Sequence, residues 1–167
     1  DQLFSLLIEI IKPEKVVASI DTSQSVEKTA EKYGKIEYTR VGDPFVIEKT
    51  LETGAQLSRE PNGHYCITEF NPYNSGTLTG ALFATSNLED KLDEIDQNST
   101  LRESIEVEDK EESMEKVKEK VKSSEDLEVI SEIDGIKFGN GKAQALIRSS
   151  GSSQKLRIVA DSGSMEE

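Results

Sequence analysis

The sequence predicts an α/β fold in two parts: an α/β layer with a mixed sheet flanked by helices, then an α+β domain with an antiparallel sheet. Strands alternate with helices over residues 1–98, which is typical of a partly parallel sheet. The pattern weakens and turns polar from Asp90 to Ser99. Residues 99–167 then carry short alternating strands and a glycine-centred hairpin. We therefore place a domain boundary near Asn98, between domains 1–98 and 99–167.

The elements of the first domain follow from apolar spacing and from helix-breaking residues. Asp1 is expected to cap a helix that Pro13 ends. Pro44 lies near the first position of a later helix, which closes at Gly54. The remaining predicted elements are strands at 15–20, 35–41, 55–59 and 65–70 and helices at 25–31 and 76–87.

The second domain begins with apolar and charged residues in alternation over 101–108, which predicts a half-buried strand containing Leu101 and Ile105. A charged helix follows, with an apolar stripe of Met114, Val117 and Val121. Residues 162–167 are typical of the start of a further helix. Strands are predicted at 127–133, 135–138, 143–149 and 156–161, the middle two joined as a hairpin around 139–141.

Composition excludes several classes of protein. The net charge of −13 argues against binding nucleic acid through its phosphates. Most of the acidic excess lies between Leu88 and Glu128, and we interpret it as solvated helix faces and a linker. Cys66 is the only cysteine, so no intrachain disulfide forms, and we expect it to be a packing residue. The apolar run at 3–11 is too short to span a bilayer and nothing resembles a signal peptide, so we expect a cytoplasmic protein without a membrane partner.

A glycine- and serine-rich loop follows a predicted strand that ends near Arg148. Backbone N–H groups in such a loop, serine hydroxyls and an arginine fork are the donors that a phosphate needs. The loop, Ser149 to Gln154, therefore predicts a phosphate site. Taken alone, such a loop is more typical of a simple connector between strands.

A second polar loop, Glu60-Pro61-Asn62-Gly63-His64, lies between two predicted strands. It combines a carboxylate, an amide and the only histidine, the mixed acceptors and donors that sugar hydroxyls require. The alternative is a polar turn with His64 as an ordinary surface residue. No second histidine or cysteine cluster accompanies His64, so no metal site is predicted. At the strand-to-helix turns, Asp43 and Asp21-Thr22-Ser23 are expected to serve as helix caps.

Five segments resemble, in sequence and in order, domains three and four of the α-D-phosphohexomutases (phosphoglucomutase, phosphomannomutase and phosphoglucosamine mutase). The connection TLRESIEVEDK followed by SMEKVKEKV is similar to that of archaeal members. The resemblance covers essentially the whole chain and implies a TATA-binding-protein-like fourth domain, truncated at its C-terminus. The five segments are VVASIDTS, YTRVGDPFV, REPNGHY, DGIKF and LIRSSGSSQKLRI.

The resemblance implies a parent enzyme that interconverts hexose 1-phosphate and hexose 6-phosphate through a phosphoserine and a bisphosphate intermediate, with Mg²⁺. The serine and aspartate loops that perform this chemistry are absent from the 167 residues, so the chain should be inactive alone, with no catalytic residue, metal or cofactor of its own. Its partners would be a hexose phosphate and the missing N-terminal domains. Mapped residues are Glu60, Asn62, Gly63, His64 and Arg40 for the sugar, and Arg148, Ser150, Gly151 and Ser152 for the non-transferring phosphate.

The chain departs from the family pattern inside both loops. Arg59 replaces the usual glycine before the sugar-loop glutamate and adds bulk and charge. Ser149 and Gln154 replace two prolines of the phosphate loop, which predicts a looser loop, and Ser153 replaces its glutamate. These changes support the alternative of a divergent, non-catalytic sugar-phosphate-binding or scaffold paralogue. An unrelated acidic α/β module is the third hypothesis.

Overall fold

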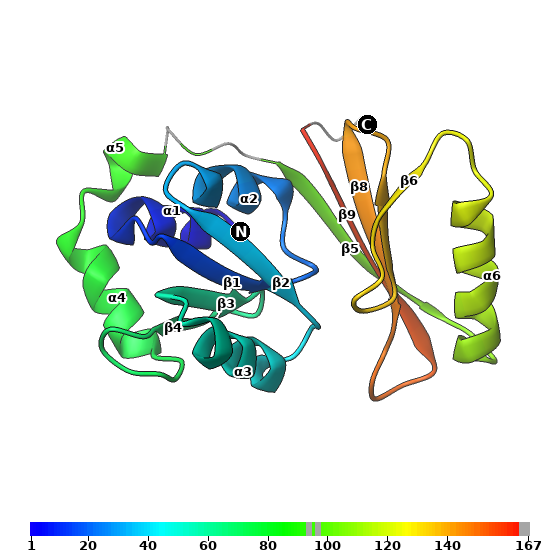
Figure 1. Cartoon of the computed structure of the whole chain (residues 1–167), viewed down its shortest axis with the longest axis horizontal. Helices are drawn as coiled ribbons and strands as arrows, with labels where there is room; N and C mark the ends of the chain where they lie inside the picture. Colours follow the sequence, from blue (N-terminus) through cyan, green and yellow to red (C-terminus); the bar gives the residue numbers. More distant parts are fainter. Residues whose placement is uncertain (93–94, 96–97, 164–167) are drawn as a thin grey trace. The chain divides into compact units, whose positions relative to one another are not determined.

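The structure is a computed structural model that describes residues 1–92, 95 and 98–163 (Figure 1). The chain folds as two compact units, Asp1–Gln97 and Asn98–Glu167, each built on one sheet. The first unit is an α/β layer with a mixed sheet, and the second is antiparallel with one packed helix. The predicted fold class is therefore confirmed.

The first sheet has the strand order β2-β1-β3-β4. The central strand β1 pairs in parallel with β2 and with β3, and β3 pairs antiparallel with β4. The parallel pairs follow from helical crossovers between their strands, because parallel neighbours need a long connection. The strands are β1 (Lys15–Ser19), β2 (Lys35–Thr39), β3 (Leu57–Glu60) and β4 (His64–Ile67).

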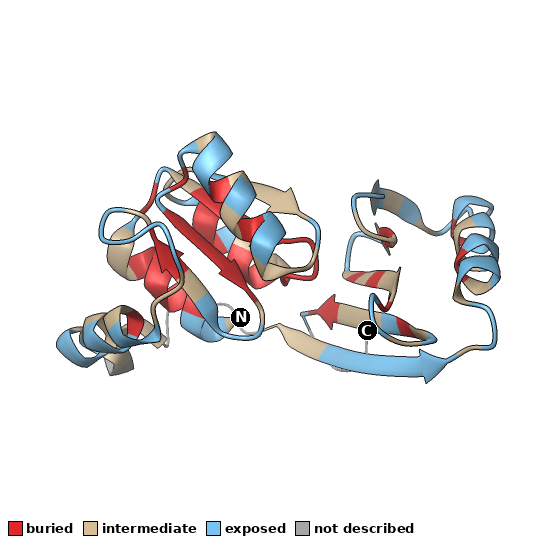
Figure 2. Cartoon of the chain, turned by 90° about the horizontal axis from the view of Figure 1, so that it is seen from below, coloured by how far each residue is buried: buried red, intermediate tan, exposed pale blue. Residues whose placement is uncertain are grey.

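Helices cover both faces of this sheet, which is why β1 and β3 are buried almost throughout (Figure 2). On one face Phe4, Val26 and Leu57 belong to the main core, with residues of α4 packed at its margin. On the other face Val17 packs with Val46 of α3. The helices are α1 (Gln2–Ile11), α2 (Gln24–Glu31), α3 (Asp43–Thr53), α4 (Gly76–Thr85) and α5 (Leu88–Leu92).

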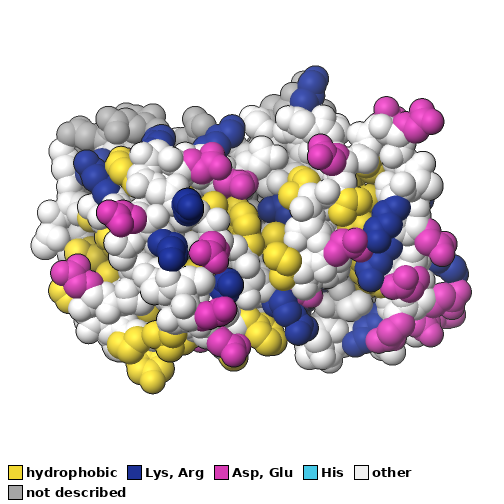
Figure 3. All heavy atoms as spheres, in the orientation of Figure 1, with side chains coloured by type: hydrophobic (Ala, Val, Ile, Leu, Met, Phe, Trp, Pro, Cys, Tyr) yellow, Lys and Arg dark blue, Asp and Glu magenta, His cyan; other side chains and the backbone are white. Residues whose placement is uncertain are grey.

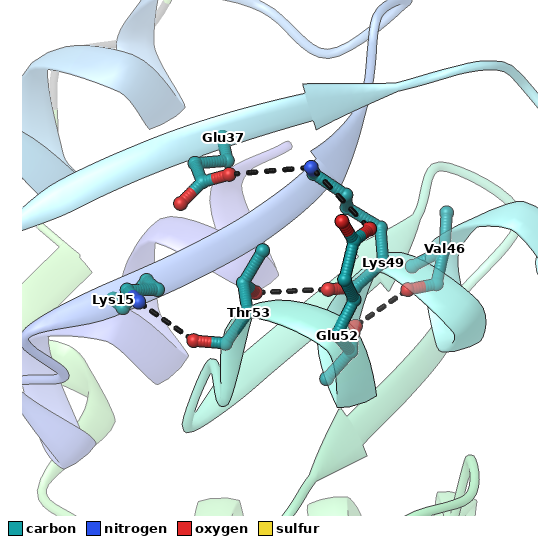
Figure 4. A network of polar contacts seen from close by, with 7 residues as sticks. Lys15, Glu37, Val46, Lys49, Glu52 and Thr53 are labelled. Carbon is teal, nitrogen blue, oxygen red and sulfur yellow. Dashed lines mark hydrogen bonds and ion pairs between the residues drawn. The ribbon is translucent and has the colours of Figure 1, made fainter.

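Polar contacts fasten α3 to the strands beneath it (Figure 4). Lys49 forms ion pairs with Glu37 of β2 at 3.6 Å and with Glu52 of its own helix at 3.5 Å. Lys15 Nζ donates to the carbonyl of Thr53 at 2.6 Å, so the helix C-terminus is tied to the start of β1. A helix held at its middle and at its end presents its first residue, Asp43, in a defined place.

The second unit is a five-stranded antiparallel sheet of order β5-β9-β8-β7-β6. Helix α6 packs its apolar stripe, including Met114 and Val121, onto one face against Ile136 and Leu156. The predicted hairpin of β7 and β8 is confirmed, and Gly141 at its tip has φ +84°. The elements are β5 (Ser99–Glu106), α6 (Lys110–Lys122), β6 (Glu128–Ser131), β7 (Ile136–Gly139), β8 (Ala143–Ser149) and β9 (Lys155–Ser162).

The acidic central stretch includes α6, whose outer face carries both signs of charge (Figure 3). Lys116 pairs with Glu112 at 2.6 Å, and Lys118 pairs with Glu115 at 3.1 Å. Such i,i+3 and i,i+4 pairs are typical of a solvated helix face. The interpretation of this part of the stretch as solvent-facing is therefore confirmed.

Some details differ from the sequence-based expectations. The strand β5 is exposed over most of its length and not half-buried: it lies at the sheet edge, and Leu101 and Ile105 are among its exposed residues (Figure 2). The helix α5 was not predicted. Ser162 ends β9 instead of starting a helix, and residues 164–167, the rest of that expected helix, lie outside the described residues.

Candidate functional site

The carboxyl ends of the parallel strands meet at one edge of the first sheet, and this edge is where ligands bind in open α/β sheets. Asp21 follows β1, Asp43 follows β2, and Glu60 is the last residue of β3. The structure thus gathers three carboxylates that are far apart in the sequence. Of these, only Glu60 was predicted as a site residue.

His64 joins Asp43 and Glu60 at this edge. Its Nδ1 lies 3.6 Å from Asp43 Oδ1 and 3.8 Å from Glu60 Oε2. Glu60 and His64 are direct partners in the β3–β4 ladder, so backbone pairing holds them side by side. We call Asp43, Glu60 and His64 the carboxylate–histidine triad.

Two expectations about the residues at this edge are wrong. Asp43 does not cap α3: Gly42 occupies the cap position, and Asp43 Oδ1 instead accepts a hydrogen bond from Asn74 Nδ2. Glu60 and His64 are strand ends and not loop residues, because the connection is a tight turn of three residues. Gly63 allows this turn with φ +90°, a conformation that favours glycine.

Burial and neighbouring charged groups determine the pKa of Glu60. Its side chain is only 9% exposed, and burial raises the pKa of the carboxyl. The neighbouring carboxylates of Asp21 and Asp43 raise this pKa further, while His64 and a hydrogen bond from Asn62 lower it. A carboxyl held this way can accept from sugar hydroxyls when ionised and donate to them when protonated.

The two arginines near this edge have different surroundings. The guanidinium of Arg40 stacks on the ring of Phe45, 4.7 Å from its centroid, and among the described residues it has no ion pair with the triad. Arg59 points to the opposite face of the sheet from Glu60, since successive strand residues alternate. It is buried, lies over Phe4 and pairs with Asp1 at 2.8 Å.

This contact corrects two expectations. Arg59 adds neither bulk nor charge beside Glu60, because its guanidinium is used inside the core between the sheet and α1. Asp1 occupies the N-cap position of α1 but makes no side-chain capping bond there, and its carboxylate binds Arg59 instead.

The predicted phosphate loop lies between β8 and β9 of the second unit, and its own hydrogen bonds close it. The amide of Ser150 donates to the carbonyl of Lys155, and the amide of Lys155 donates to the carbonyl of Ser153, both at 2.9 Å. The hydroxyl of Ser153 donates to that of Ser150, also at 2.9 Å, and Lys110 Nζ donates to the carbonyl of Ser150 at 3.2 Å. These hydrogen bonds order the loop in place of the two prolines of the family pattern, which this chain lacks.

The loop residues differ in accessibility. Ser150 is buried, whereas Gly151 and Ser152 are exposed at the tip. Arg148 precedes the loop and lies 4.0 Å from Asp134 of the β6–β7 turn. Gly151 and Ser152 are therefore the mapped loop residues that lie open to solvent, and Arg148 lies at the base of the loop.

The register of the second sheet adds Arg157, which sequence reasoning missed. Arg148 and Arg157 are direct cross-strand partners, so their side chains lie on the same face. Two like charges placed opposite one another are unfavourable without an anion between them. Lys155 is already paired with Glu106 at 3.1 Å, whereas Arg157 has no ion pair among the described residues. Alternation along each strand does not show that Arg148 and Arg157 lie opposite one another, because that depends on the pairing register of β8 and β9.

One further reactive side chain, the thiol of Cys66, has a structural role. Cys66 is buried on β4, where burial raises the pKa of its thiol, so its predicted role in packing is confirmed. No helix among the described residues is long and apolar enough to cross a membrane.

Comparison with known proteins places these features in a family. Residues 1–100 match the model of the phosphoglucomutase/phosphomannomutase α/β/α domain III. The chain belongs to the phosphoglucomutase/phosphomannomutase family. Phosphoglucosamine mutase of Geobacillus kaustophilus is 29% identical over 163 residues, 93% of this chain and 34% of the relative. Probable phosphoglucosamine mutase of Methanosarcina barkeri is 32% identical over 156 residues, 90% of this chain and 35% of that protein.

Solved structures share the fold of this family member. A phosphoglucomutase/phosphomannomutase family protein of Burkholderia thailandensis superposes with a TM-score of 0.79 at 19% identity, over 99% of this chain and 37% of that one. The chain thus spans about a third of the length of the relatives it matches. It corresponds to the C-terminal domains of the family.

Proposed function

We propose that the chain is the substrate-recognition portion of a phosphohexomutase that interconverts hexose 1-phosphate and hexose 6-phosphate. The observation that carries the proposal is the carboxylate edge of the first sheet, where Glu60 is preorganised by its ladder partner His64. Glu60, with Asn62, Gly63 and His64, would bind the sugar hydroxyls, and Arg40 would line the rim. Fixed acceptors at a sheet edge suit a neutral, hydroxyl-rich ring.

The loop of the second unit would hold the phosphate that is not transferred. Arg148 would form a bidentate contact, Ser150 and Ser152 would add hydroxyl donors, and Gly151 and Ser152 would add backbone donors. We add Arg157 to this set, because its guanidinium shares a sheet face with Arg148. Binding of this kind positions the substrate and adds no bond-making group of its own.

The phosphoryl transfer would belong to the parent protein's other domains, in the cytoplasm. The chain has neither a serine loop of the T-x-S-H-N-P form nor an aspartate loop of the D-G-D-x-D-R form, so the parent's Mg²⁺ does not fit these residues. The non-catalytic paralogue stays as a second candidate because Ser149, Ser153 and Gln154 alter the phosphate loop. Arg59 no longer favours it, since that side chain faces away from the site.

A titration of the isotope-labelled chain with glucose 6-phosphate tests the proposal. We expect the amide signals of Arg148 and of Ser150 to Ser152 to shift, together with those of Glu60 and His64. The variant Arg148→Gln should weaken binding by about tenfold or more, because a hydrogen bond to a charged group contributes about 1.5–3 kcal/mol. Arg102→Gln, a change of another sheet arginine, should leave it unchanged. Amide signals that ignore a saturating ligand in the folded chain would refute the site.

A further inference from the structure

The carboxylate–histidine triad also has the composition of a metal site. Its three donors come from three different elements: Asp43 from the start of α3, Glu60 from the end of β3 and His64 from the start of β4. One ligand atom from each lies within 4.8 Å of the other two. Donors that converge from separate elements hold their geometry better than neighbours on one flexible loop.

Each donor is held, yet the group is open to solvent on one side. Asn74 Nδ2 donates to Asp43 Oδ1 and orients that carboxylate, in the manner of the outer hydrogen bonds that orient metal ligands. Glu60 is fixed by burial and by its strand. The side chain of His64 is 49% exposed, which leaves an entry path for a hydrated ion.

The local charge favours a cation. Asp21, Asp43 and Glu60 bring three carboxylates to this edge, and His64 is the one basic side chain that pairs with the triad among the described residues. Even a protonated imidazole leaves an excess of negative charge. A divalent ion would neutralise this excess and would relieve the repulsion among the carboxylates.

The donor types select the class of ion. Imidazole nitrogen suits zinc and its neighbours, whereas Mg²⁺ prefers all-oxygen, octahedral sites. Zinc bonds of about 2.0–2.2 Å in a tetrahedral site require donor separations of roughly 3.3–3.6 Å. The separation of 3.6 Å between His64 Nδ1 and Asp43 Oδ1 lies at the upper end of this range, and that of 3.8 Å between His64 Nδ1 and Glu60 Oε2 is slightly wider. Small side-chain rotations of His64 and Asp43, which are both partly exposed, would close that difference.

We propose that Asp43, Glu60 and His64 bind one divalent transition-metal ion of the zinc class and that this ion excludes a sugar from the same edge. The site would make the recognition portion sensitive to inhibition by free zinc. The binding of the ion is independent of the proposed function. The exclusion of a sugar rests on that function, because it requires Glu60 to be a sugar ligand.

Calorimetric titration of the chelator-treated chain with Zn²⁺, in a millimolar excess of Mg²⁺, tests the metal site. Mg²⁺ occupies carboxylates that bind any divalent ion, so the Zn²⁺ signal reports sites that use the imidazole. We expect one saturable Zn²⁺ per chain, weakened at least about tenfold in His64→Gln and in Asp43→Asn. The matched control is Glu132→Gln, because Glu132 is a partly exposed carboxylate of the other unit, paired with Lys122. Equal Zn²⁺ affinity in His64→Gln and in the unmodified chain would overturn the proposal, as would the absence of saturable binding.

A second titration separates this inference from the proposed function. Glucose 6-phosphate is added with and without saturating Zn²⁺, and the Glu60 amide is followed. Loss of the sugar-induced shift at Glu60 in the presence of Zn²⁺ supports exclusion, and an unchanged shift overturns it. Zn²⁺ binding in a chain that ignores glucose 6-phosphate would contradict the proposed function and would leave the metal site standing.

Discussion

At the scale of single residues, Glu60 keeps a buried carboxyl at the sheet edge at a cost in stability. Its carboxyl is buried among other carboxylates, which raises its pKa above the ordinary value. The folded state is therefore favoured when Glu60 is protonated and loses that advantage as the pH rises through the folded-state pKa. Functional sites commonly retain such unfavourable groups.

Glu60→Gln should therefore stabilise the chain at neutral pH while weakening its binding of hexose phosphate. Removal of the buried charge should raise Tm by about 1–4 °C at pH 7, and the gain should shrink to nothing near pH 4, where the wild-type carboxyl is protonated. Thermal unfolding at the two pH values measures this difference. A Tm gain at pH 4 as large as that at pH 7 would show that the charge of Glu60 is not its cause.

At the scale of elements, the β6–β7 turn positions Arg148. Gly135 has φ +80°, and a Cβ there would lie 2.1 Å from the carbonyl oxygen of Ile147 and 2.7 Å from the Cα of Arg148. The turn therefore packs directly on the backbone of β8. This close approach brings Asp134 beside the arginine that precedes the predicted phosphate loop.

Gly135→Ala should destabilise the chain by about 2–4 kcal/mol, because it combines a left-handed conformation with a backbone clash. Gly141→Ala is the matched control: its φ is +84°, but a Cβ there would meet open space. The control should lose only about 1–2 kcal/mol. Urea unfolding measures the free energy of unfolding of both variants. Similar losses in the two would mean that the close approach of Gly135 to β8 does not contribute to stability.

At the scale of the whole molecule, the proposed function separates recognition from chemistry. In that proposal the first unit would bind the sugar hydroxyls at its sheet edge, and the second would bind the phosphate at its loop. Neither contains a nucleophile or a metal loop of the family's reacting kind. Each unit has a hydrophobic core of its own.

The chain by itself should therefore not convert glucose 1-phosphate to glucose 6-phosphate, even with Mg²⁺ and glucose 1,6-bisphosphate present. A coupled dehydrogenase assay that detects glucose 6-phosphate measures this, with an intact phosphoglucomutase as the positive control. Turnover above background that follows the purified chain would contradict the assignment of all chemistry to other domains.

Local patterns in the sequence determined most of the secondary structure of this protein and indicated its family. Apolar periodicity and breakers such as Pro13 and Gly54 located most helices and strands, because these signals depend on neighbours along the chain. The order of the motifs indicated the family, and the glycine- and serine-rich composition after Arg148 indicated an anion loop. Glu60 and His64 were singled out by residue type alone.

Only the tertiary structure decided which of these residues meet. The sequence predicted Asp43 as a helix cap, whereas in the structure it lies beside His64. The two residues meet since the carboxyl ends of parallel strands converge at one edge. Arg59 looked like a disturbance beside Glu60 and proved to be a core residue, because alternation along β3 sends the two side chains to opposite faces. Arg157 joined Arg148 through the strand register, which no local pattern encodes. Distances between residues remote in sequence depend on packing, and packing is decided by the whole chain.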